Sequence, residues 1–145
     1  MVLADSKKIE IFQKIVQFKT DNRNEAAVAS YISDLFSGYD NVQSHFIQAD
    51  TGRKSLVLTI KGKKPGNKVL AFSGHEDTVS AGDLSTWTRD PFKAEIQENI
   101  LYGRGADDMK GGLSALTSAA LAIVTAGSNF SGSLKLIGTV GEETS

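Results

Sequence analysis

Two short apolar segments, each followed at once by charged residues, constrain the fold of this 145-residue chain most strongly. Residues 69–72 lead through Ser73-Gly74 into His75-Glu76-Asp77, and residues 134–140 lead into Gly141-Glu142-Glu143. The continuous apolar run at 69–72 predicts a central strand that is covered on both faces, and the apolar residues of 134–140 predict another buried strand. Ligands of such sheets bind beyond the carboxyl ends of the strands. Both charged clusters are therefore expected at one ligand-binding edge.

Further segments have the patterns of helices and of a strand. Residues 5–19 and 28–36 repeat apolar side chains at three- and four-residue spacing, which predicts two amphipathic helices. Asn22 or Asn24 is expected to cap the second helix, and Gly38 to follow it in the left-handed conformation. A helix over residues 111–124 is apolar on most of its circumference and is expected to pack inside.

Strand patterns complete the expected architecture. Residues 55–60 alternate between apolar and polar side chains, and residues 42–47 are expected to form a weaker partner strand. Residues 94–102 predict a hairpin that turns near Glu98-Asn99. Helices that alternate with buried strands favour the α/β class, here a three-layer sandwich around a mostly parallel mixed sheet.

Composition narrows the chemistry that this sheet edge can carry. The chain has no cysteine, which excludes a disulfide framework, a thiolate zinc site and a cysteine nucleophile. Sixteen Lys and Arg balance seventeen Asp and Glu, so we expect binding neither to nucleic acid nor to an anionic membrane. Charged residues at positions 5, 7, 8 and 10 interrupt the start of the chain. We therefore expect no signal peptide, no membrane span and a cytoplasmic protein.

Three polar clusters offer histidine and carboxylate ligands. His75 and Asp77 are two residues apart in an extended segment and therefore project to the same side. The Asp107-Asp108 pair precedes the buried helix and could simply cap it, and the Glu142-Glu143 pair alone would indicate a solvated loop. Because one sheet edge would collect all three clusters, we favour a metal site made of histidine and carboxylates.

Other catalytic motifs fail on spacing. Gly103-Arg104-Gly105 lacks the third glycine of a dinucleotide fingerprint, because position 108 is Asp. Position 110 is Lys where a phosphate loop starting at Gly105 would need glycine, and the chain has no Gly-x-Ser-x-Gly elbow. A Ser/His/Asp triad stays open, and His45 is expected at the surface.

Taken in order, the motifs resemble those of a known family. They are the segments 73–79, 87–92 and 101–112, followed by Gly141-Glu142-Glu143. They are similar to the successive motifs of the zinc-dependent deacylase and exopeptidase family, which contains acetylornithine deacetylase, succinyl-diaminopimelate desuccinylase, aminoacylase and glutamate carboxypeptidase. The resemblance implies that residues 1–145 are the N-terminal portion of the metallohydrolase catalytic domain. The lid or dimerisation domain and the C-terminal part of the catalytic domain would be absent.

The resemblance also implies a role for each site residue. His75 would ligate one zinc ion, Asp108 would bridge two, and Glu143 would ligate the other. Asp77 would orient His75, and Glu142 would be the general base that passes a proton from a metal-bound water to the leaving amine. The peptide bond after Asp108 would be cis, as it often is in relatives. Cobalt or manganese could replace zinc.

The implied enzyme is a di-zinc amidohydrolase that cleaves an N-acetyl or N-succinyl amide of an amino acid. Each zinc would have two ligands in this chain, fewer than the roughly four that zinc prefers, so the chain alone is expected to be inactive. The whole protein is expected to act on small molecules and to form a homodimer through the lid. Two alternatives stay open: a di- or tripeptide aminopeptidase or a carboxypeptidase of the same family, and a non-catalytic binding module.

Overall fold

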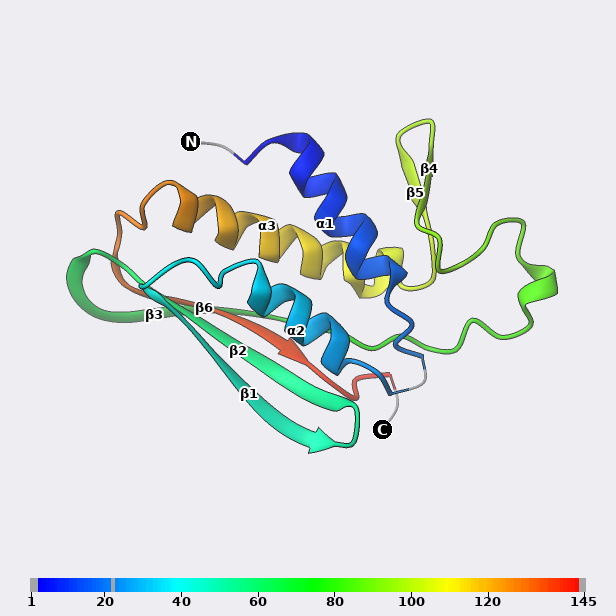
Figure 1. Ribbon diagram of the computed structural model, residues 1–145, viewed down its shortest axis with the longest axis horizontal. Helices are drawn as coiled ribbons and strands as arrows, with labels where there is room; N and C mark the ends of the chain where they lie inside the picture. Colours follow the sequence, from blue (N-terminus) through cyan, green and yellow to red (C-terminus); the bar gives the residue numbers. More distant parts are fainter. Residues whose placement is uncertain (1–2, 22, 144–145) are drawn as a thin grey trace.

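The computed structural model describes residues 3–21 and 23–143. Three helices lie on one face of a four-stranded sheet, and a two-stranded hairpin stands beside α1 and the start of α3 (Figure 1). This arrangement confirms the expected α/β class. The elements are α1 (Asp5–Gln17), α2 (Ala26–Asp34), β1 (Val42–Asp50), β2 (Arg53–Lys61), β3 (Lys64–His75), the 3₁₀ turn η1 (Leu84–Thr86), β4 (Glu95–Gln97), β5 (Ile100–Tyr102), the π-helical turn η2 (Ala106–Gly111), α3 (Gly112–Thr125) and β6 (Ser131–Thr139).

The sheet is mixed and has the strand order β1-β2-β6-β3. β6 runs parallel to β3, whereas the pairs β1–β2 and β2–β6 are antiparallel. This corrects the expectation of a mostly parallel sheet. Only Thr51 and Gly52 connect β1 to β2, and so short a connection makes a hairpin rather than the crossover that parallel strands require.

The core lies between the sheet and its helices. Alternate residues of β2 and β6 point toward the helices, and burying one such large apolar side chain contributes roughly 1.5–3 kcal/mol. The buried cluster includes Leu56, Leu58, Ile60, Leu134 and Leu136 from the strands and Ile11, Ile15, Val28, Ile32, Leu113 and Leu121 from the helices. This core fixes β6 and α3, the two elements that flank the predicted site.

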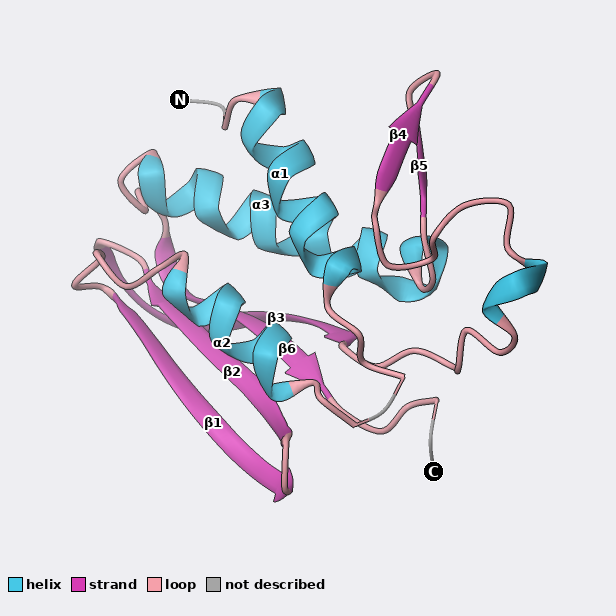
Figure 2. Ribbon diagram, turned by 45° about the vertical axis from the view of Figure 1, so that its right-hand side comes forward, coloured by secondary structure: helices cyan, strands magenta, loops and turns pink. Residues whose placement is uncertain are grey.

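The helices cover one face of the sheet, so the described residues supply two layers of the expected three (Figure 2). β3 was expected to be a central strand covered on both faces. It lies instead at the edge of the described sheet, and Val69, Leu70 and Phe72 are exposed. The apolar run correctly predicted a strand. It did not predict that one face of this strand is uncovered in the described residues.

The ends of α2 differ from the expectation. Glu25 occupies the N-cap position without a side-chain hydrogen bond to the helix, so Asn24 is not the cap, and Asn22 lies outside the described residues. The helix ends at Asp34, and Gly38 does not have a positive φ. No helix in the described ranges has the length and apolar character needed to cross a bilayer.

Two local expectations are confirmed. Glu98 and Asn99 have φ angles of 51° and 65° between β4 and β5, as a type I′ hairpin turn requires. The peptide bond between Asp108 and Met109 is cis, as the resemblance implied.

Candidate metal centre

The predicted site residues meet at the carboxyl ends of the parallel strands β3 and β6. His75 is the last residue of β3 and pairs with Thr139, the last residue of β6, so the two strand ends lie side by side. Glu142 and Glu143 follow β6, and Asp108 lies in η2, directly before α3. Parallel pairing thus brings together side chains that are far apart in the sequence.

His75 is at the centre of the cluster. Its Nε2 atom lies 3.0 Å from Asp108 Oδ1 and 4.0 Å from Glu142 Oε2. Three possible ligand atoms, one from each of His75, Glu142 and Glu143, lie within 4.8 Å of one another. The side chain of His75 is only 6% exposed, whereas those of Asp108 and Glu142 are 77% and 62% exposed. The cluster therefore combines a buried nitrogen donor with carboxylates that solvent and small ligands can reach.

This donor set fits a divalent transition metal. Imidazole together with carboxylate suits zinc and its neighbours in the first transition row. Two ligands of a tetrahedral zinc ion, each about 2.0–2.1 Å from it, lie about 3.3 Å apart. The 3.0 Å between His75 Nε2 and Asp108 Oδ1 is close to that separation. His75 Nδ1 faces the backbone oxygen of Asp77 at 3.0 Å, which leaves Nε2 as the ligand atom.

The carboxylates also affect the protonation of His75. Burial alone would lower the pKa of this imidazole. The hydrogen bond to Asp108, the backbone contact with Asp77 and the negative charges of both carboxylates outweigh burial and raise the pKa of His75 above its ordinary 6.5. Because only neutral imidazole ligates a metal, binding at Nε2 is expected to release a proton.

Asp77 connects the two strand ends. Its fully buried carboxylate accepts the backbone N–H of Glu142 at 3.3 Å and that of Glu143 at 2.9 Å. The same carboxylate lies 3.6 Å from His75 Nδ1. Asp77 therefore holds the turn that carries Glu142 and Glu143. The His-x-Asp spacing could not reveal this contact, because the turn is remote in the sequence.

Glu76 points the opposite way from its neighbours, as the alternation of an extended segment requires. Its side chain is fully buried beside Gly138 of β6, and neither carboxylate oxygen has a hydrogen-bond partner in the described structure. Burial, reinforced by the charges of Glu25 and Asp77, raises the pKa of Glu76 to about 9. The carboxyl group is therefore neutral at pH 7 in the folded chain.

Three further buried charged residues near the site were not identified from the sequence. Arg53 and Glu25 form an ion pair, with Arg53 Nη2 2.9 Å from Glu25 Oε1. The ammonium group of Lys110, two residues after Asp108, donates to the backbone oxygen of Phe18 at 2.6 Å. Lys110 lies in the motif segment 101–112, but the motif does not reveal its contact, and no local pattern marks Arg53 or Glu25, because each partner lies in a distant segment.

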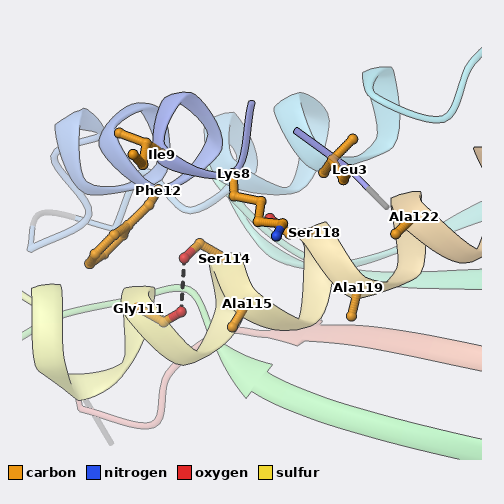
Figure 3. Close-up of a pocket in the computed structure, with 10 residues that line it drawn as sticks. All are labelled: Leu3, Lys8, Ile9, Phe12, Gly111, Ser114, Ala115, Ser118, Ala119 and Ala122. Carbon is orange, nitrogen blue, oxygen red and sulfur yellow. Dashed lines mark hydrogen bonds between the residues drawn. The ribbon is translucent and has the colours of Figure 1, made fainter. Parts of the chain in front are cut away.

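An apolar pocket of about 430 Å³ lies between α1 and α3 (Figure 3). Lys8 is the one charged residue among those that line it, and the predicted site residues are not among them. The hydroxyl group of Ser114 is turned toward the backbone oxygen of Gly111 at 2.8 Å and is thereby satisfied within α3. The pocket is therefore separate from the candidate metal centre.

The sequence model of peptidase family M20/M25/M40 matches residues 71–145, more than half of the chain. This range includes His75, Asp77, Asp108, Glu142 and Glu143. The chain belongs to peptidase family M20/M25/M40. The family match, together with relatives named as desuccinylases, confirms the resemblance drawn from the motifs.

Curated members of the family match nearly the whole of this chain. A protein of Staphylococcus epidermidis named "Probable succinyl-diaminopimelate desuccinylase" is 39% identical over 143 residues, which are 99% of this chain and 34% of that protein. Succinyl-diaminopimelate desuccinylase of a Wolbachia species is 33% identical over 138 residues, 94% of this chain and 34% of that enzyme. The chain thus spans about a third of the length of these M20/M25/M40 relatives.

A solved structure supports the fold. The aminopeptidase PepT from Bacillus cereus matches with a TM-score of 0.74 at 22% identity, over 98% of this chain and 38% of that one. At this identity the likeness shows that the two chains share a fold.

Proposed function

We propose that residues 1–145 are the N-terminal portion of the catalytic domain of a metal-dependent amidohydrolase that cleaves an N-succinyl or N-acetyl amide of an amino acid. The observation that carries this proposal is the meeting of His75, Asp108, Glu142 and Glu143 at one sheet edge. A desuccinylase-like substrate is supported by the names of the relatives that are 33% and 39% identical to the chain.

The proposed ligands are His75, Asp108 and Glu143, and Asp108 would hold both metal ions. When bound, zinc, or cobalt or manganese in its place, supplies polarisation of the amide carbonyl and a lowered pKa for the attacking water. The exposure of Asp108 supports this role, since its carboxylate is open to an ion and a substrate while still contacting the buried His75.

Glu142 is the proposed general base. Its carboxylate lies 4.0 Å from the ligand nitrogen of His75 and faces solvent, where a reacting water can reach it. There it can accept the proton of the water as the water oxygen bonds to the acyl carbon. It can then give that proton to the amine nitrogen as the carbon–nitrogen bond breaks, leaving a carboxylate and a free amine. Asp77 would keep Glu142 in place through the backbone.

The chain alone is proposed to be inactive, because it offers two ligands to each metal ion and zinc prefers about four. The complete protein would supply the remaining ligands, and a lid through which it forms a homodimer. We also propose a small-molecule substrate and a cytoplasmic location, with no nucleic-acid or membrane partner. The near-neutral net charge of −1 supports the expected absence of an anionic polymer partner.

A substrate panel tests the proposal. The complete protein that carries this chain, loaded with zinc, is expected to hydrolyse N-succinyl-diaminopimelate or N-acetylornithine faster than a tripeptide. The opposite preference would favour the peptidase alternative, which the likeness in fold to an aminopeptidase keeps as the second candidate. Binding of the acyl amino acid without zinc and without turnover would favour a non-catalytic module.

A further inference from the structure

A buried ion pair lies next to the turn that carries the proposed base and one proposed ligand. Arg53, the first residue of β2, donates through Nε to Glu25 Oε1 at 3.0 Å, and its Nη2 lies 2.9 Å from the same oxygen. The two side chains are 9% and 1% exposed. Because removing two charges from water is costly, a pair this deeply buried is weak evidence for stability and more consistent with a role in fixing one arrangement.

The guanidinium group of Arg53 also lies beside Gly141, in the space that a side chain at this position would enter. A Cβ atom added to Gly141 would lie 3.1 Å from Arg53 Nη2 and 3.9 Å from its Cζ. Gly141 has a φ of +81°, a conformation that side chains rarely adopt. The guanidinium group therefore lies directly beside the backbone of the residue that precedes Glu142.

We propose that Arg53, held by Glu25, is a positioning residue for the Glu142-Glu143 turn. Asp77 holds this turn from β3 through two backbone N–H groups, and Arg53 supports it from β2 through contact with Gly141. With both supports in place, the turn keeps Glu142 and Glu143 beside His75 before metal binds. The inference rests on the proposed function, because it assigns Arg53 to the proposed metal centre.

The contact depends on the shape of arginine as well as on its charge. The planar guanidinium group directs two N–H groups at one oxygen of Glu25, while its Nη2 end lies beside Gly141. Lysine would keep a positive charge for Glu25, but its single ammonium group would leave the contact with Gly141 unfilled. The variant Arg53→Lys therefore keeps the positive charge beside Glu25 but removes the support of the Glu142-Glu143 turn.

The test compares Arg53→Lys with Arg23→Gln in the complete protein. Arg23 forms an ion pair with Asp50 at 3.6 Å, which joins the segment before α2 to the β1–β2 hairpin, as the Arg53–Glu25 pair does. This control pair is 61% and 59% exposed. Zinc affinity is measured by competition with a chromophoric chelator, and the unfolding of the metal-free protein by urea titration. Arg53→Lys is expected to weaken zinc binding 10- to 100-fold, and Arg23→Gln less than twofold.

The possible results distinguish a failure of the role given to Arg53 from a failure of the proposed function. If Arg53→Lys unfolds more easily without metal but binds zinc within twofold of the wild type, Arg53 is only structural and the inference is overturned. If the folded wild-type protein binds no zinc, the proposed function fails and the inference fails with it. If Arg53→Lys does not fold, Glu25→Asp replaces it, because the shorter side chain withdraws the carboxylate from the guanidinium group. Zinc affinity within twofold of the wild type in this variant would likewise overturn the inference.

Discussion

Asp77 is a buried residue that contacts both His75 and the turn that carries Glu142 and Glu143. Its carboxylate accepts two backbone N–H groups from the turn after β6, while its backbone oxygen contacts the imidazole of His75. Hydrogen bonds to a charged group contribute about 1.5–3 kcal/mol each to stability, more than those between neutral groups. Asp77 thus fixes the distance between a proposed ligand and the proposed base.

The variant Asp77→Asn is expected to lower the free energy of unfolding by about 2–3 kcal/mol and zinc affinity by about 10- to 100-fold. The amide replaces one acceptor oxygen with a donor, which then faces an N–H group of the turn. Asp83→Asn is the matched control, because Asp83 is exposed and accepts the N–H of Ser85 at 2.9 Å in η1. Urea unfolding and chelator competition measure both effects. Equal zinc affinities in the two variants would contradict the role given to Asp77.

Glu76 makes stability depend on pH. Because the pKa of Glu76 is raised from 4.5 to about 9, its favourable contribution is complete below pH 4.5 and is lost as the pH rises toward 9. In this window the loss approaches about 1.4 kcal/mol per pH unit. Glu76→Gln keeps the shape without the charge. We expect it to stabilise the metal-free chain by about 3 kcal/mol at pH 7 and to flatten the profile. The free energy of unfolding is measured by urea titration from pH 5 to 9. If it changes with pH equally in the two proteins, Glu76 is not the cause of the pH dependence.

Within elements, apolar periodicity identified the helices and strands, but it did not determine which strands pair. The 5–19 pattern predicted α1, and the alternation over 55–60 predicted most of β2. The edge position of β3 depends on contacts between distant segments, which periodicity does not encode. The site shows the same limit. The motifs brought out His75, Asp108 and the two glutamates, whereas the Arg53–Glu25 pair became visible only when its partners were placed in space.

A substitution at Gly138 tests how β6 packs against Glu76, the residue that follows β3. A Cβ atom at this position would overlap the buried carboxylate of Glu76, so Gly138→Ala is expected to destabilise the chain by about 1–3 kcal/mol. Gly38→Ala is the control, because nothing lies within 4 Å of its added Cβ and its φ is not positive. We expect this control to be neutral or slightly stabilising. Similar melting temperatures for the two variants would contradict the described packing.

In the whole molecule, the described residues form a helix layer on one face of the four-stranded sheet, and apolar side chains of β3 are exposed at the edge of that sheet. The chain spans about a third of its curated relatives. The cluster at the sheet edge is therefore proposed as the first half of an active site, whose other ligands lie in the remainder of the protein. We expect no zinc-dependent hydrolysis by the 145-residue chain alone. Turnover of N-acetylornithine by the purified chain would contradict this incomplete ligand set.

The cluster at this sheet edge is proposed to support metal-dependent hydrolysis of an acyl amide. The most direct measurement is the rate of N-succinyl-diaminopimelate hydrolysis by the complete protein, compared with and without zinc and with Glu142→Gln. We expect zinc-dependent turnover that falls by about 10²–10⁴-fold in the variant, while zinc stays bound. Turnover that persists after removal of zinc, or that is unchanged in Glu142→Gln, would show that this cluster does not carry the reaction.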